Sequence, residues 1–166
     1  MRGFLYMEFN IKLIRIDDRL IHGQVATTWT KNLGIEQILI INDEAVKDEV
    51  MQSVANFAAP PGVDVKIFGV EQFINIVQSN SIKKPTMLLF KNVLDVLRLS
   101  DSGFNIKSVN AGGMGFKEGR KRMTRAISVT PEENEAFKRL IDKEIEIIFQ
   151  MIPNDPREKY KDVYNS

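Results

Sequence analysis

Short apolar runs recur along the chain and alternate with segments whose apolar residues have helical spacing. Runs of strand length stand at 11–16, 36–41, 63–68, 86–90, 106–110, 125–129 and 145–152. Segments with helical spacing lie between most of them, at 23–33, 44–58, 70–79, 93–101 and 131–142. Strands that alternate with helices of this length need crossover connections. The pattern therefore predicts an α/β fold, with one doubly wound, mostly parallel sheet of about seven strands and helices on both faces.

Turn and cap residues mark several boundaries of these elements. The sequence TPEE at 130–133 joins a capping threonine, a first-turn proline and two acidic residues, which is typical of a helix start. Gly34 fits a helix C-terminus, and Asp43 follows one strand and precedes the next helix. No helix is predicted between 106–110 and 125–129, so we expect one of these two strands to run antiparallel.

The length and the even composition indicate one domain rather than several. The chain has 166 residues without an internal repeat or a low-complexity tract. We expect a leader at 1–10, the α/β domain at 11–153 and a polar tail at 154–166 that frays or forms a short edge helix. No apolar run is long enough to span a membrane, so we expect a soluble, cytoplasmic protein.

Composition excludes several kinds of chemistry. The chain has no cysteine, which removes a cysteine nucleophile, a thiolate metal site and a disulfide framework. Its formal net charge is +1, so the global field gives no reason to expect nucleic acid as a partner. No motif predicts a metal or a cofactor. The one local charge excess is the basic run KEGRKRMTR at 117–125, which fits either a docking edge or a solvated loop.

The candidate chemistry lies in RIDDRLIHGQV, between the first predicted strand and the first predicted helix. This places Asp17, Asp18, Arg19 and His22 in the loop at the carboxyl end of a strand, where sites of open α/β sheets lie. The helix start offers unpaired N–H groups to a phosphate, and Arg19 adds a permanent charge. His22 is a nucleophile at neutral pH, and either aspartate can fix its tautomer. The loop therefore predicts a phosphoryl-accepting histidine, whereas a lone histidine of unspecified position is more often structural.

A second, weaker motif is NAGGM at 110–114, after the fifth predicted strand. Its glycines permit close backbone approach, so the loop can supply N–H donors to the same phosphate. The chain has neither G-x-G-x-x-G in this loop nor G-x-x-x-x-G-K-[ST] anywhere, so a nucleotide site lacks its usual signature.

The segment RIDDRLIHGQV resembles the active-site signature of IIB subunits of the mannose/fructose/sorbose family of the bacterial sugar phosphotransferase system. The segments NDE, AAPPGV, MLLF, VNAGGM and ISVT follow in the family's order, so the resemblance covers about Ile11 to Pro153. It implies that His22 is phosphorylated through Nδ1, that Arg19 steadies the phosphohistidine, and that Asp17 is the acid beside it. The residues expected to border the site are Asp18, Gly23, Gln24, Asp43, Asn110, Gly112 and Gly113; Asp43 is included on the premise that the first two strands are neighbours.

The resemblance also implies the partners of the protein. A IIA phosphocarrier is the expected phosphoryl donor, and a sugar that enters through membrane IIC and IID subunits is the final acceptor. Peripheral contact with those permease subunits is expected, no cofactor is implied, and self-association stays open. Other IIB classes use a phosphocysteine, which this chain lacks.

Two alternatives come from other functional classes. A signalling receiver domain also has an acidic pair after its first strand, but the third predicted strand ends in KIFGV without the acceptor aspartate. A nucleotide-dependent α/β enzyme is favoured only by fold analogy and by the glycine loop.

Overall fold

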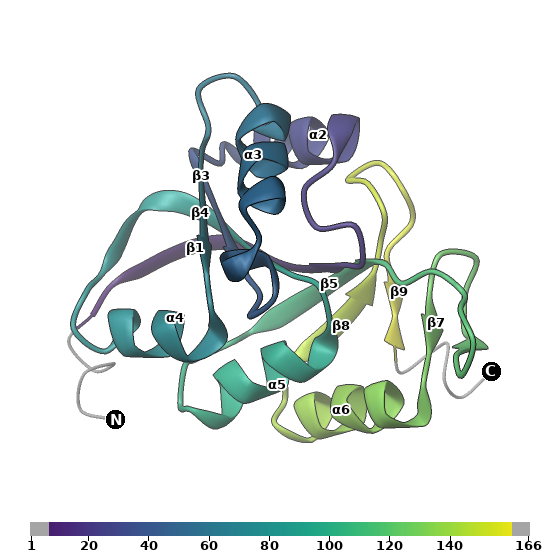
Figure 1. Cartoon of the computed structure of the whole chain (residues 1–166). Helices are drawn as coiled ribbons and strands as arrows, with labels where there is room; N and C mark the ends of the chain where they lie inside the picture. Colours follow the sequence, from purple (N-terminus) through teal and green to yellow (C-terminus); the bar gives the residue numbers. More distant parts are fainter. Residues whose placement is uncertain (1–6, 161–166) are drawn as a thin grey trace.

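A mostly parallel sheet forms the centre of the molecule (Figure 1). The computed structural model describes residues 7–160, and within them the main sheet has seven strands in the order β3-β2-β4-β1-β5-β8-β9. Each neighbouring pair is parallel except β8 and β9. The strands are β1 (Phe9–Asp17), β2 (Gln37–Ile41), β3 (Asp64–Phe68), β4 (Ile82–Phe90), β5 (Ser108–Gly113), β8 (Glu146–Phe149) and β9 (Glu158–Lys159). The predicted fold class is confirmed.

Helices cover both faces of the sheet, because alternate residues of each strand point to opposite sides. Figure 1 shows α2 and α3 on one face and α4, α5 and α6 on the other. Ile38 and Ile40 of β2 pack in the core that Trp29 of α2 joins, whereas Leu39 and Ile41 pack in the core on the opposite face. The helices are α2 (Gly23–Leu33), α3 (Glu49–Ala58), α4 (Val70–Val77), α5 (Val93–Asp101) and α6 (Pro131–Asp142), with a 3₁₀ turn η1 (Ala45–Lys47).

Local capping explains where the helices begin and end. The Thr130 hydroxyl accepts from the Glu133 backbone N–H, and the Glu133 carboxylate accepts from the Thr130 N–H. Gly34 takes the left-handed conformation, with φ 63°, at the end of α2. The segment predicted as one helix at 44–58 is two elements, because Asp48 has extended backbone and its carboxylate caps α3 by accepting from two backbone N–H groups.

The expected positions of the outer strands were wrong in two places. Residues 125–129 do not form a strand of the seven-stranded sheet; Ser128–Val129 (β7) pairs with Lys121–Arg122 (β6) in a separate two-stranded sheet, and Ile127 makes only an isolated parallel bridge with Met114, just after β5. The antiparallel edge strand of the main sheet is β9, which lies in the segment expected to fray or form a helix. Tyr160 explains this, because its side chain is buried beside Phe137 and Phe149 and anchors the tail to α6 and β8.

The order of the central strands determines which loops meet. β1 begins at Phe9, so the expected boundary after residue 10 cuts through this strand. β4 lies between β1 and β2, whereas β5 pairs directly with β1. The loops after β1 and β5 are therefore neighbours at the carboxyl edge of the sheet, and the loop after β2 lies farther away.

Candidate active site

The loop after β1 connects the sheet to α2 and carries the predicted histidine. Ile14 and Ile16 pack in the core of the α4–α6 face, so Arg15 and Asp17 point toward the α2 face. A tight turn follows, in which the Leu20 backbone N–H donates to the Asp17 carbonyl at 2.9 Å. Leu20 has φ 56° and is buried. Its anchored side chain holds the loop in a conformation that non-glycine residues seldom adopt.

Asp17 is the centre of the site. Its side chain has no solvent-exposed area and its two oxygens accept hydrogen bonds from three residues. One oxygen accepts from Arg15 Nη2 at 3.1 Å and lies 2.9 Å from His22 Nε2. The other accepts from the Arg19 backbone N–H at 3.0 Å and lies 3.4 Å from Arg19 Nε. One buried carboxylate thus joins the strand, the turn and the start of α2.

The charge state of Asp17 decides the tautomer of His22. Burial acts to raise the pKa of Asp17, but hydrogen bonds from His22 and the Arg19 backbone, with the charge of Arg15, hold it below its ordinary value of 3.8. Asp17 is therefore a carboxylate at neutral pH and only accepts hydrogen bonds. His22 Nε2 must carry the proton in this contact, which leaves Nδ1 with its lone pair in the neutral ring.

His22 stands at the start of α2 and is accessible. It occupies the N-cap position with extended backbone, and its side chain caps no helix N–H. The first turn of α2 has no acidic residue, so its positive end is not neutralised locally. The side chain of His22 is 23% exposed, and that of Arg19 is 56% exposed. The His22 ring, the exposed Arg19 side chain and the start of α2, whose first N–H groups have no partner within the helix, therefore occur in one loop.

Arg15 lies beside Asp17 in the buried network and was not among the predicted site residues. Its guanidinium donates to Asn110 Oδ1 at 2.6 Å and to the Gln150 carbonyl at 3.2 Å, besides Asp17. It also lies 5.6 Å from the centre of the Trp29 ring. The sequence held one signal for this role. Arg15 is two residues before Asp17 on the same strand, and residues two apart on a strand point to the same face.

Gly112 and Gly113 lie against these buried side chains. A Cβ at Gly112 would stand 2.0 Å from Arg15 Cζ, and one at Gly113 would stand 3.0 Å from Asp17 Oδ1. The backbone of β5 therefore approaches Arg15 and Asp17 as closely as only glycine permits. The two glycines make room for the charged pair, and Asn110, the third predicted residue of this loop, binds Arg15.

Comparison with known proteins places these residues in a family. The family model described as PTS system sorbose subfamily IIB component matches residues 11–166. The chain belongs to this family. It is 41% identical to the mannose-specific EIIAB component of Escherichia coli K12 over 92% of this chain and 48% of the relative, so it spans about half of that protein. It is 36% identical to the sorbose-specific EIIB component of Klebsiella pneumoniae, over 93% of this chain and 95% of the relative.

Solved structures show the same fold for IIB components. The IIBSor domain of the sorbose permease from Klebsiella pneumoniae superimposes with a TM-score of 0.86 at 35% identity, covering 96% of this chain and 97% of that domain. The IIB resemblance found in the sequence is thereby confirmed. Membership of this family leaves the receiver and nucleotide-enzyme alternatives without support.

Arg120 is a second residue of this IIB component that the sequence did not single out. Its side chain is 1% exposed, and all of its N–H groups have acceptors: both oxygens of Asp18, both oxygens of Glu133 and the Gly115 carbonyl. Burial opposes the charge, but the two carboxylates raise the pKa of Arg120. Asp18 is thus tied to the segment after β5 through Gly115 and Arg120. Within the basic run Arg120 had no local signal to separate it from its neighbours.

Asp43 does not join the site, because the premise of adjacent β1 and β2 was wrong. Its carboxylate caps α4 by accepting from the Val70 N–H at 2.9 Å, and it binds Arg98 at 3.0 Å. These bonds lower the pKa of Asp43. The residue that caps the helix after β2 is Asp48. Asp43 therefore caps a helix that lies farther along the chain than the one that directly follows β2.

Gly23 and Gln24 lie at the first turn of α2, beside His22, and both are exposed. Gly23 has φ +36° with nothing near its missing Cβ, so the backbone rather than crowding favours glycine here. No side-chain hydrogen bond joins either residue to Asp17 or Arg19 among the described residues.

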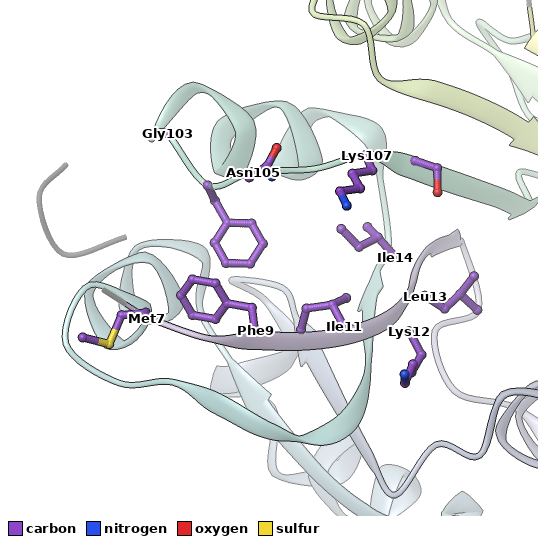
Figure 2. Close-up of a pocket in the computed structure, with 11 residues that line it drawn as sticks. Met7, Phe9, Ile11, Lys12, Leu13, Ile14, Gly103, Asn105 and Lys107 are labelled. Atoms are coloured by element: carbon purple, nitrogen blue, oxygen red, sulfur yellow. The ribbon is translucent and has the colours of Figure 1, made fainter. Parts of the chain in front are cut away.

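A large cavity of the protein lies away from this loop. Figure 2 shows a groove between the first half of β1 and the segment before β5, with Phe9, Ile11, Lys12, Asn105 and Lys107 around it. This is the amino end of the strands, opposite to His22. The volume of the groove is about 630 Å³. Within residues 7–160, no group of three acidic or histidine side chains could hold a metal ion, and no helix is long and apolar enough to cross a membrane.

Replacement of Gly112 by alanine is expected to destabilise the fold by about 3 kcal/mol, because the new methyl group would overlap the buried Arg15 guanidinium. Urea unfolding measures the loss. Gly115 is the matched control, since its nearest neighbour would be 3.9 Å away, and Gly115→Ala should cost less than about 1 kcal/mol. Equal losses in the two variants would contradict the proposed close approach of β5 to Arg15.

Proposed function

We propose that this chain is a phosphocarrier in which His22 accepts a phosphoryl group from a phosphohistidine on a IIA protein and passes it to a sugar. The observation that carries the proposal is the contact of His22 Nε2 with the buried Asp17 carboxylate at 2.9 Å. This contact orients the ring and leaves Nδ1 as the nucleophile. A sugar of the mannose, fructose or sorbose type is the proposed acceptor, as the names of the relatives suggest.

The transfer step balances without a cofactor. The Nδ1 lone pair of His22 forms a bond to phosphorus as the bond between phosphorus and the donor histidine nitrogen breaks. The donor nitrogen recovers its lone pair. The proton on His22 Nε2 stays in its hydrogen bond to the Asp17 carboxylate. Because phosphoryl transfer depends on in-line placement and charge stabilisation, few protein groups are needed.

Arg19 is the proposed partner of the transferred phosphoryl group. Its terminal guanidinium nitrogens make no hydrogen bond to another described residue, so they can turn toward the oxygens. Other residues border the site in this proposal, as positioning residues or backbone donors. They are Asp18, Gly23, Gln24, Asn110, Gly112 and Gly113. The open site also suits release, since a carrier that held the group too tightly would not pass it on.

The partners follow from the same proposal. A IIA protein supplies the phosphoryl group, and membrane IIC and IID subunits present the sugar; the chain works in the cytoplasm and meets the permease only transiently. An exposed His22 lets both partners reach one nitrogen in turn. Interfaces of this kind are small.

The direct test is intact-protein mass spectrometry after incubation with phosphorylated IIA protein from the same organism. We expect one acid-labile phosphoryl group on the wild-type chain and none on His22→Gln. His22 is the only histidine of the chain, so a single substitution removes every histidine acceptor. Phosphorus NMR should show Nδ1 attachment. A wild-type chain that stays unmodified beside active donor would refute the proposal.

A further inference from the structure

The segment after β5 carries an exposed aromatic residue among exposed basic ones. Phe116 is 69% exposed, and Lys117, Lys121, Arg122 and Arg125 are exposed around it in the sequence. We name these five residues the Phe116 surface. The segment contains one acidic residue, Glu118. Its remaining basic residue, Arg120, is buried in ion pairs with Asp18 and Glu133. The segment thus presents one exposed aromatic side chain and four exposed cations.

Hydrogen bonds attach the segment of this surface to Asp18 in the loop after β1. The Gly115 N–H donates to Asp18 at 2.8 Å, and the Gly115 carbonyl accepts from Arg120 at 2.8 Å. The Ser128 N–H donates to the Met114 carbonyl at 2.7 Å, which ties the returning strand to the end of β5. Asp18 in turn adjoins Asp17 and Arg19. Hydrogen bonds therefore anchor the segment on both sides of Phe116, and an anchored segment loses less conformational entropy on binding.

Another exposed apolar group lies elsewhere and serves as a comparison. Val50, Val54 and Phe57 form a stripe on α3, and Phe57 is 94% exposed. No hydrogen bond connects this helix to the His22 loop among the described residues, and Phe57 lies in its last turn. It offers a matched aromatic residue at a site away from the chemistry.

We propose that the phosphoryl-donor protein docks on the Phe116 surface, with an apolar pocket for Phe116 and carboxylates around that pocket. This inference rests on the proposed phosphotransfer to His22. Charge favours the donor as the occupant over the permease, because cytoplasmic loops of membrane proteins carry excess lysine and arginine and would repel a basic surface. A buried aromatic anchor within a charged rim is typical of fast, transient protein pairs.

The first experiment measures the rate of His22 phosphorylation against the concentration of phosphorylated IIA protein. For Phe116→Ser we expect KM to rise at least tenfold while kcat stays within about twofold, because docking is weakened and the chemistry is intact. Phe57→Ser is the control and should leave both constants unchanged. Urea unfolding of both variants should match the wild type, since both side chains are exposed.

The second experiment tests the charges. The double variant Lys121→Gln/Arg122→Gln should lower kcat/KM severalfold at low salt and flatten its dependence on ionic strength. Lys83→Gln/Lys84→Gln is the control, because these two residues are also adjacent and exposed but lie near the amino end of β4. It should keep the wild-type salt dependence.

The outcomes separate this inference from the proposed function. If the donor phosphorylates the wild-type chain and the Phe116→Ser variant has the same KM and kcat, the docking surface is overturned. The carrier function then stands. Flotation with vesicles of phosphatidylglycerol and phosphatidylethanolamine tests a membrane instead. The proposal is overturned if the wild type binds these vesicles, Phe116→Ser does not bind them, and the variant keeps the wild-type KM for the donor protein. The surface would then be assigned to lipid.

Discussion

Replacement of Asp17 by asparagine is expected to slow phosphorylation of His22 by on the order of a thousandfold. The carboxylate accepts hydrogen bonds from Arg15, Arg19 and His22. The amide of asparagine has an NH₂ group in place of one acceptor oxygen, so it would face some of these groups donor to donor. The His22 ring would then lose its fixed tautomer, and a proton on Nδ1 blocks attack. The rate is measured by mass spectrometry with saturating phosphorylated IIA protein, per folded molecule.

Two further measurements keep this expectation testable if the variant is unstable. Nitrogen-15 NMR of the unmodified wild type should show His22 protonated at Nε2 and bare at Nδ1 at a pH where the ring is neutral. The control Asp64→Asn changes an exposed aspartate whose ion pair with Lys84 is on the surface, and it should transfer normally. A well-folded Asp17→Asn chain with the wild-type rate would show that the carboxylate does not orient His22.

Replacement of Arg120 by methionine is expected to lower the free energy of unfolding by about 3–5 kcal/mol. The loss is large because Glu133, only 8% exposed, and Asp18 would both lose the cation that pairs with them. The pKa of Glu133 is held below its ordinary value by Arg120 against the effect of burial, so the unpaired carboxylate is costly at neutral pH. Urea unfolding measures this loss, which is a large part of a typical stability of roughly 5–15 kcal/mol.

Conservative and compensating variants show which property of Arg120 matters. Arg120→Lys keeps the charge but loses the fork that binds two carboxylates, so an intermediate loss is expected. Adding Asp18→Asn and Glu133→Gln to Arg120→Met should recover part of the stability, since no buried charge is then left alone. A loss under about 1 kcal/mol for Arg120→Met would show that the ion pairs are not structural.

Local signals predicted the elements well wherever a helix has its own caps. The ranges predicted for α2, α5 and α6 agree with the structure, and each of these helices begins or ends at a capping residue such as Asn92, Thr130 or Gly34. The prediction was poorest at the sheet edges. A short strand such as β9 is paired through two residues, and its placement depends on the distant contacts of Tyr160 rather than on its own period.

The sequence alone was enough to predict the α/β class, the family and the loop that carries Asp17, Arg19 and His22. These residues lie within six consecutive positions at the end of one strand, so their proximity follows from local geometry. Only the tertiary structure decided that Arg15 joins Asp17 to Asn110 and that Asp43 lies outside this network, at the start of α4. The physical reason is strand order: pairing between distant segments sets which strands are neighbours, and hydrophobic period carries no information about it.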